Sequence, residues 1–178
     1  MGVSNPPSGP QDPNTGSIPP ALRGLDAALP ELVALYRDLH AHPELSFEEH
    51  RTAAEIARHA TAYGCDVTPG VGRTGVVAVL DNGAGPTVLL RADFDALPLA
   101  ERTGLPYASR TEGVMHACGH DLHVTCLLGA LKLLAAARGS WRGRRGGRFG
   151  HGDLLRFGTG PHRRARDGLT IAGRRPSR

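Results

Sequence analysis

The chain has 178 residues, with 21 Lys or Arg against 17 Asp or Glu and a formal net charge of +4 at pH 7. This length is typical of one domain, and no run of about 18 apolar residues is present that could form a membrane-spanning helix. The N-terminus lacks the basic and apolar regions of a signal peptide, so we expect a cytoplasmic protein with reduced thiols. Two of its cysteines, Cys65 and Cys126, are predicted to be small core residues.

The charge is divided unevenly along the chain. Residues 1–138 contain 10 Lys or Arg and 15 Asp or Glu, a balance of −5, whereas residues 139–178 contain 11 Arg and 2 Asp, a balance of +9. These balances give the total of +4. The last glutamate in the chain is Glu112. The C-terminal segment therefore differs in kind from the rest and offers no glutamate for catalysis.

The first predicted elements are a leader and two helices. Residues 1–22 are rich in Pro, Gly, Ser and Asn, a composition typical of a disordered leader. Leucines spaced three and four apart over residues 25–39 predict an amphipathic helix, and its regular part is expected to begin near Pro30 because proline is tolerated at a helix start. A second helix is predicted over residues 46–64.

The second helix has recognisable boundary residues. Ser46 and Glu49 have the spacing of a capping box, in which each side chain accepts a hydrogen bond from the other residue's backbone N–H. Gly64 is suited to the left-handed conformation that often ends a helix. The apolar face between them consists of Ala53, Ile56, Ala57 and Ala60.

Strands and a third helix are predicted next. Short β-like runs cover residues 65–71, 74–81 and 86–95, and "NGAG" between the last two indicates a hairpin. Apolar residues at helical spacing then predict a helix over residues 121–138. This order predicts an α/β fold with a mixed sheet flanked by helices. From residue 143 onward no period is sustained, so residues 143–178 are predicted to be an irregular tail.

Two short stretches contain residue types that carry chemistry. In Cys118-Gly119-His120, a thiolate and an imidazole could both bind a first-row metal ion, and Gly119 would let the backbone turn so that they converge. The alternative is a buried cysteine beside a surface histidine. In "LLRADFDALP", a strand ends in Asp93 and Asp95, which would place carboxylates at the rim of the sheet. The alternative is an ordinary strand end with solvated aspartates.

Taken together, four stretches resemble the N-terminal third of the metal-dependent amidohydrolases, a family that includes hippurate hydrolase, hydrolases of auxin–amino acid conjugates and N-acyl-amino-acid amidohydrolases. The resemblance covers about residues 30–143, in order and with natural spacing. It implies a fragment of a zinc-peptidase-like catalytic domain that holds two divalent ions, Mn²⁺ or Zn²⁺. The stretches are "DLHAHPELSFEEHRTA", "GVGRTGVVAVL", "GPTVLLRADFDALPLAERTGLPYAS" and "GVMHACGHDLHVTCLLGALKLL".

The same resemblance assigns roles to individual residues. Cys118 and His120 match the first two metal ligands, with the thiolate of Cys118 bridging the two ions. Asp95 matches the catalytic aspartate, which orients a ligand and binds no metal itself, and Asp93 is a second candidate for that role. His123 is expected near the site without being a ligand. The two histidines of "HAHPEL", His40 and His42, are expected to be structural or to face the substrate.

The implied reaction is hydrolysis of an N-acyl-amino acid or a short peptide. The ions would lower the pKa of water and stabilise the oxyanion, and a glutamate would act as general base. The family places that glutamate in a Gln-Pro-Ala-Glu-Glu block shortly after Trp141-Arg142-Gly143, but no such block follows here. The family's downstream glutamate and two histidines have no matching positions either.

We therefore divide the chain into a leader (1–22), a partial catalytic domain (23–142) and an Arg/Gly-rich tail (143–178), which we interpret as the product of a reading-frame shift. The chain as given is expected to be inactive and to expose a strand edge that favours aggregation. A rival hypothesis takes "RGRRGGRFG" as an Arg-Gly-Gly segment of a nucleic-acid-binding protein. That reading leaves the four stretches unexplained, so nucleic acid is not the expected partner.

Overall fold

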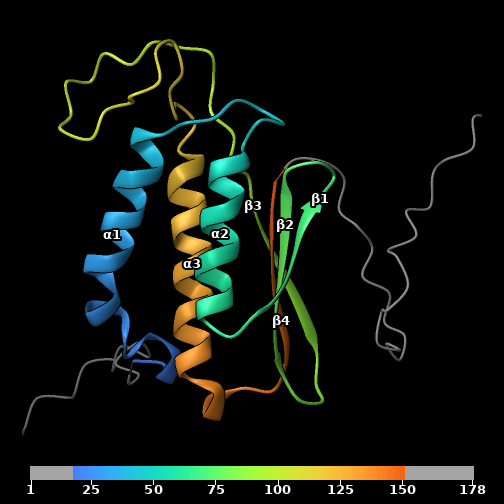
Figure 1. Cartoon of the computed structure of the whole chain (residues 1–178). Helices are drawn as coiled ribbons and strands as arrows, with labels where there is room; N and C mark the ends of the chain where they lie inside the picture. Colours follow the sequence, from blue (N-terminus) through green and yellow to red (C-terminus); the bar gives the residue numbers. More distant parts are fainter. Residues whose placement is uncertain (1–17, 151–178) are drawn as a thin grey trace, which may run out of the picture.

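A computed structural model describes residues 18–150, and these form a layer of helices on one face of a four-stranded sheet (Figure 1). The expected helices and the first three strands are confirmed. Residues 1–17 and 151–178, with most of the predicted leader and tail, lie outside the described residues. The elements are η1 (Pro20–Leu22), α1 (Leu25–Ala41), α2 (His50–Ala62), β1 (Asp66–Val71), β2 (Gly75–Asn82), β3 (Thr87–Ala92), α3 (His120–Ala136), η2 (Arg138–Ser140) and β4 (Gly143–Phe149).

The sheet is mixed, as predicted, and its strand order is β1-β2-β4-β3. β2 is antiparallel to β1 and to β4, and β3 is parallel to β4. The predicted hairpin between β2 and β3 is wrong, because β4 lies between them. The side-chain amide of Asn82 donates to the carbonyl oxygens of Arg138 and Trp141 at 2.7 and 2.6 Å. These contacts tie the "NGAG" stretch to the segment that leads into β4.

The prediction that the chain is irregular from residue 143 onward is wrong for residues 143–149, which form β4 in the interior of the sheet. Backbone groups make the ladder bonds whatever the side chains are, so a strand of Arg and Gly can still pair with both neighbours. Phe149 is fully buried opposite Val76 of β2. A Cβ on Gly143 would lie 2.2 Å from the carbonyl oxygen of Pro86, so only glycine fits that position. Part of the proposed Arg-Gly-Gly segment is therefore sheet.

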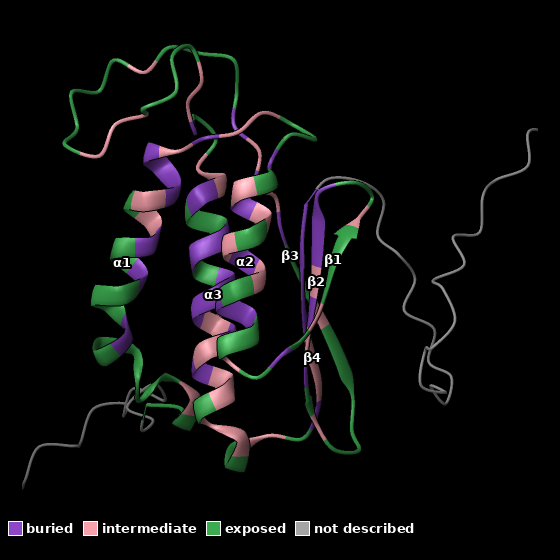
Figure 2. Ribbon diagram, viewed as in Figure 1, coloured by how far each residue is buried: buried purple, intermediate pink, exposed green. Residues whose placement is uncertain are grey.

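The core lies between the sheet and the helices α2 and α3, while α1 packs on α3 (Figure 1). Burial follows the predicted periods: alternate residues of β2 are fully buried, as are Ile56 of α2 and Leu128 of α3. Buried residues recur along α3 and β2 (Figure 2). These apolar side chains supply most of the favourable free energy of folding. Within residues 18–150, no helix is long and apolar enough to cross a membrane.

Two sequence-based boundaries near the N-terminus are corrected. The 3₁₀ helix η1 lies inside the segment predicted as a disordered leader. Helix α1 already begins at Leu25 and contains Pro30 in its interior. Proline removes one backbone hydrogen bond there, but the helix buries Leu32, Leu35 and Leu39 further along, which compensates for that loss.

The cysteines also differ from expectation in one case. Cys65 is buried in the core as predicted, whereas Cys126 is exposed on α3. Helix α3 is apolar on nearly all sides, so apolar spacing alone did not identify which face would be covered. Its exposed side also includes Leu122.

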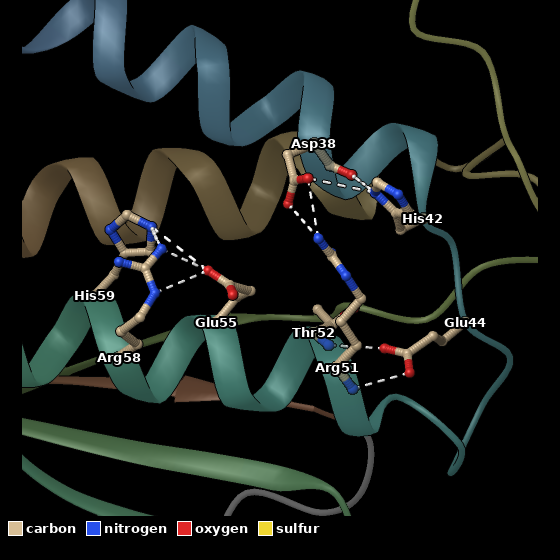
Figure 3. Close-up of polar contacts among 8 residues, drawn as sticks. All are labelled: Asp38, His42, Glu44, Arg51, Thr52, Glu55, Arg58 and His59. Carbon is tan, nitrogen blue, oxygen red and sulfur yellow. Dashed lines mark hydrogen bonds and ion pairs between the residues drawn. The ribbon is translucent and has the colours of Figure 1, made fainter.

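The start of α2 is stabilised by a residue other than those predicted. The Ser46–Glu49 capping box does not form: the helix begins at His50, and Glu49 makes no capping bond with its side chain. The carboxylate of Glu44 instead accepts hydrogen bonds from the backbone N–H groups of Arg51 and Thr52, at 2.9 and 2.7 Å (Figure 3). These are two of the N–H groups that a helix start leaves without a partner inside the helix.

Candidate metal centre

Three segments that are distant in sequence meet at the end of the molecule where the long loop between β3 and α3 lies (Figure 1). One is the segment after the carboxyl end of β3, with Asp93 and Asp95. The second is the N-terminus of α3, preceded by Cys118. The third is the C-terminal end of α1, with His40. Sites in α/β proteins commonly form outside the carboxyl ends of strands in this way.

His120 is held by Asp95. Its Nδ1–H group donates to the carboxylate Oδ1 of Asp95 and to the backbone oxygen of the same residue, with nitrogen–oxygen distances of 2.7 and 3.0 Å. Because Nδ1 carries the proton in these hydrogen bonds, the neutral ring has its lone pair on Nε2. Asp93 makes a different contact, an ion pair at 2.6 Å with Arg91. Of the two candidate aspartates, Asp95 is therefore the one that orients His120.

Cys118 precedes α3 by a tight turn. Gly119 occupies the N-cap position with φ 74°, in the left-handed region that favours glycine. The thiol of Cys118 is exposed. The ring of His123, one turn further along α3, lies 5.5 Å from that of His120, centroid to centroid. Among the described residues, no group of three or more His, Cys, Asp or Glu is arranged to hold a metal ion.

A buried polar network lies directly behind this turn, and sequence reasoning did not identify its carboxylates. His40 Nδ1–H donates to Asp121 Oδ2 at 2.6 Å, and His40 Nε2–H donates to Glu101 Oε1 at 3.3 Å. The side chains of Asp121 and Glu101 are only 1% and 4% exposed. Burial opposes the charged ring, but the two carboxylates outweigh it and raise the pKa of His40. An imidazole that donates from both nitrogens is doubly protonated.

His116 was also missed by sequence reasoning. It is 4% exposed, and neither ring nitrogen has a hydrogen-bond partner among the described residues. Burial lowers the pKa of this ring, which favours its neutral form. Its ring lies 6.4 Å from that of His40. The sequence signal was its place in "MHACGH", two residues before Cys118.

The side chains at this turn fit part of a metal centre. A thiolate and an imidazole nitrogen are ligands of Zn²⁺. The carboxylate of Asp95 on the far nitrogen of His120 matches the arrangement that fixes the tautomer of metal-binding histidines. Two ligands do not complete a tetrahedral or a dinuclear site. The described residues therefore fit as one side of such a site.

Comparison with known proteins agrees with this description. Residues 89–146 match peptidase family M20/M25/M40. The chain is 47% identical over 115 residues to N-acetyl-L-cysteine deacetylase of Bacillus subtilis, covering 64% of this chain and 28% of that protein. It is 49% identical over 107 residues to hippurate hydrolase of Campylobacter jejuni, covering 60% of this chain and 28% of that protein.

A solved structure shares the fold. The YXEP protein of Bacillus subtilis, a dinuclear metal-binding peptidase of the M20 family, aligns with a TM-score of 0.66 and 40% identity over 70% of this chain and 35% of that one. The chain thus spans about a third or less of the length of these proteins. In sequence and in fold, it resembles the N-terminal third of the metal-dependent hydrolases of peptidase family M20/M25/M40.

Proposed function

We propose that this chain is the N-terminal part of a metal-dependent amidohydrolase that cleaves N-acyl-amino acids. The hydrogen bond from His120 to Asp95 carries the proposal, because it leaves Nε2 of His120 available as a ligand one residue from the Cys118 turn. The names of two relatives, a deacetylase of N-acetyl-L-cysteine and a hydrolase of hippurate, point to an N-acyl-amino acid as the substrate class. A short peptide is the other substrate that the family suggests.

In this proposal, each residue has a distinct task. Two divalent ions, Zn²⁺ or Mn²⁺, would lower the pKa of water and stabilise negative charge on the acyl oxygen. Asp95 keeps the proton of His120 on Nδ1, so that the unprotonated Nε2 would be available to bind an ion. Cys118, which precedes the left-handed Gly119, would contribute its thiolate as a second ligand. A glutamate would accept the proton from water.

The 178-residue chain alone is proposed to be inactive, because no glutamate follows Glu112. We further propose a reading-frame shift near residue 143. Its support is that β4 has glycine at three of seven positions and buries Arg148, although Gly is depleted in strands and buried Arg is rare. The test is translation of the genomic nucleotides in the other two frames. A Gln-Pro-Ala-Glu-Glu-like run in one of them is expected, and its absence from both contradicts the frame shift.

The function itself is tested in the longer parent protein by metal content and by turnover of N-acetyl- and N-benzoyl-amino acids. Cys118→Ser and His120→Ala are each expected to abolish turnover and to lower the metal content. The matched controls are Cys126→Ser and His50→Ala, which remove an exposed thiol and an exposed imidazole that are not ligand candidates. Normal turnover at normal metal content in both site variants would refute the assignment.

A further inference from the structure

Two successive residues in the first turn of α3 are hydrogen-bonded to partners from different parts of the chain. His120 is bonded to Asp95, which follows β3, and Asp121 is bonded to His40 at the end of α1. Asp121 Oδ1 also accepts from the backbone N–H of Leu122 at 2.9 Å. The carboxylate of Asp121 thus connects α1 with the backbone of the turn that presents both ligand candidates.

The contact between His40 and Asp121 is the shorter of the two that His40 makes. It is 2.6 Å long, against 3.3 Å for the contact with Glu101. His40 and Asp121 are both buried. A buried pair of opposite charge loses much of its stabilisation when one partner is removed, since the other is then left without compensation. The Asp121 carboxylate is therefore expected to turn or to draw in water when His40 no longer donates to it.

We propose that His40 is a positioning residue for the metal centre. Its Nδ1–H holds the carboxylate of Asp121 in place. Asp121 in turn sets the orientation of the turn at the start of α3 that presents Cys118 and His120. This role rests on the proposed function. The bond from Nε2 to Glu101 has a separate task in this scheme. Glu101 also accepts hydrogen bonds from Ser109 N–H, at 2.5 Å, and from the Thr103 hydroxyl, so it organises the loop between β3 and α3.

Two substitutions at the same position separate these tasks. The side-chain nitrogen of Asn lies about where Nδ1 of histidine lies, whereas that of Gln lies about where Nε2 lies. His40→Asn therefore retains a donor toward Asp121, and His40→Gln retains a donor toward Glu101. Both variants lose the charge of the ring and one of its two hydrogen bonds. Only His40→Asn keeps the contact with Asp121, which the proposal makes responsible for positioning.

The test is a titration of the longer parent protein with Co²⁺, followed by thiolate-to-metal charge-transfer absorbance, with thermal unfolding measured alongside. His40→Gln is expected to bind Co²⁺ about tenfold more weakly, the lower end of effects seen for residues behind metal ligands. His40→Asn is expected to stay close to the unsubstituted protein. An equal loss in both variants, through weaker binding or through unfolding, overturns the positioning role, and so does unchanged affinity in His40→Gln.

A control distinguishes failure of this inference from failure of the proposed function. If Cys118→Ser leaves the Co²⁺ absorbance of the parent protein unchanged, the metal centre itself is refuted. The positioning role is then decided by hydrogen exchange of the backbone N–H groups of Leu122 and His123, which both donate to Gly119 O at 3.1 Å. Faster exchange in His40→Gln than in His40→Asn supports it, and equal rates overturn it.

Discussion

At the scale of single residues, the charge of His40 depends on its two carboxylate partners, and so does its contribution to stability. Burial alone would lower the pKa of His40, but hydrogen bonds to Asp121 and Glu101 raise it. Burial alone would raise the pKa of Glu101, but hydrogen bonds from Ser109, Thr103 and His40 lower it. The folded state therefore holds the His40 proton more tightly than the unfolded state, and it holds a proton on Glu101 less tightly.

These shifts predict how stability changes with pH. The contribution of His40 is fully present below its unfolded pKa of about 6.5 and is lost as the pH rises through its raised folded value. The contribution of Glu101 is lost as the pH falls through its lowered value. Thermal unfolding of the chain should therefore show a midpoint that declines as the pH rises above about 6.5. His40→Gln should weaken that decline, whereas His42→Gln, outside the network, should not. An unchanged decline in His40→Gln would contradict the assignment.

At the scale of elements, the start of α2 depends on Glu44 and on the ion pair that joins α1 to α2. Arg51 in the first turn of α2 donates to both carboxylate oxygens of Asp38, at 3.0 and 2.8 Å (Figure 3). Phe47 has a positive φ of 66°, which no helical residue adopts, so the chain cannot be helical from Ser46 onward. Glu44 reaches the helix from before this turn and takes over the capping role.

The capping role can be measured by urea unfolding. Glu44→Ala is expected to lower the free energy of unfolding by about 1–2 kcal/mol, since two backbone N–H groups lose a charged acceptor. Ser46→Ala, which would break the predicted capping box, should be close to neutral. Glu48→Ala serves as the control for removing an exposed carboxylate nearby. A large loss for Ser46→Ala together with none for Glu44→Ala would restore the capping box.

At the scale of the whole molecule, the described sheet ends at β3 with apolar side chains in contact with solvent. Val88 and Leu90 are 42% and 43% exposed, and β3 pairs on only one side within residues 18–150. A strand edge of this kind can pair with another chain. The full chain should therefore self-associate as its concentration rises.

Light scattering against concentration tests this expectation. The double substitution Val88→Lys and Leu90→Lys should reduce association, because charges on an edge strand disfavour pairing between chains. Leu22→Lys is the matched control, since it removes an exposed leucine from η1, in a different part of the fold. Equal effects of the two changes would show that association does not use the β3 edge.

The sequence by itself determined the helices, the first three strands and the mixed sheet, and it indicated the residues to which the proposal assigns the chemistry. These follow from local rules, because hydrophobic spacing reports burial within one element and Cys118-Gly119-His120 is contiguous. Only the tertiary structure decided that β4 lies between β2 and β3, that Glu44 caps α2, and that Asp95 bonds to His120 while Asp93 pairs with Arg91. It also brought His40 to Asp121, a residue 81 positions away. Backbone pairing and buried polar contacts join groups that are distant in sequence, and no periodicity within a segment encodes such partners.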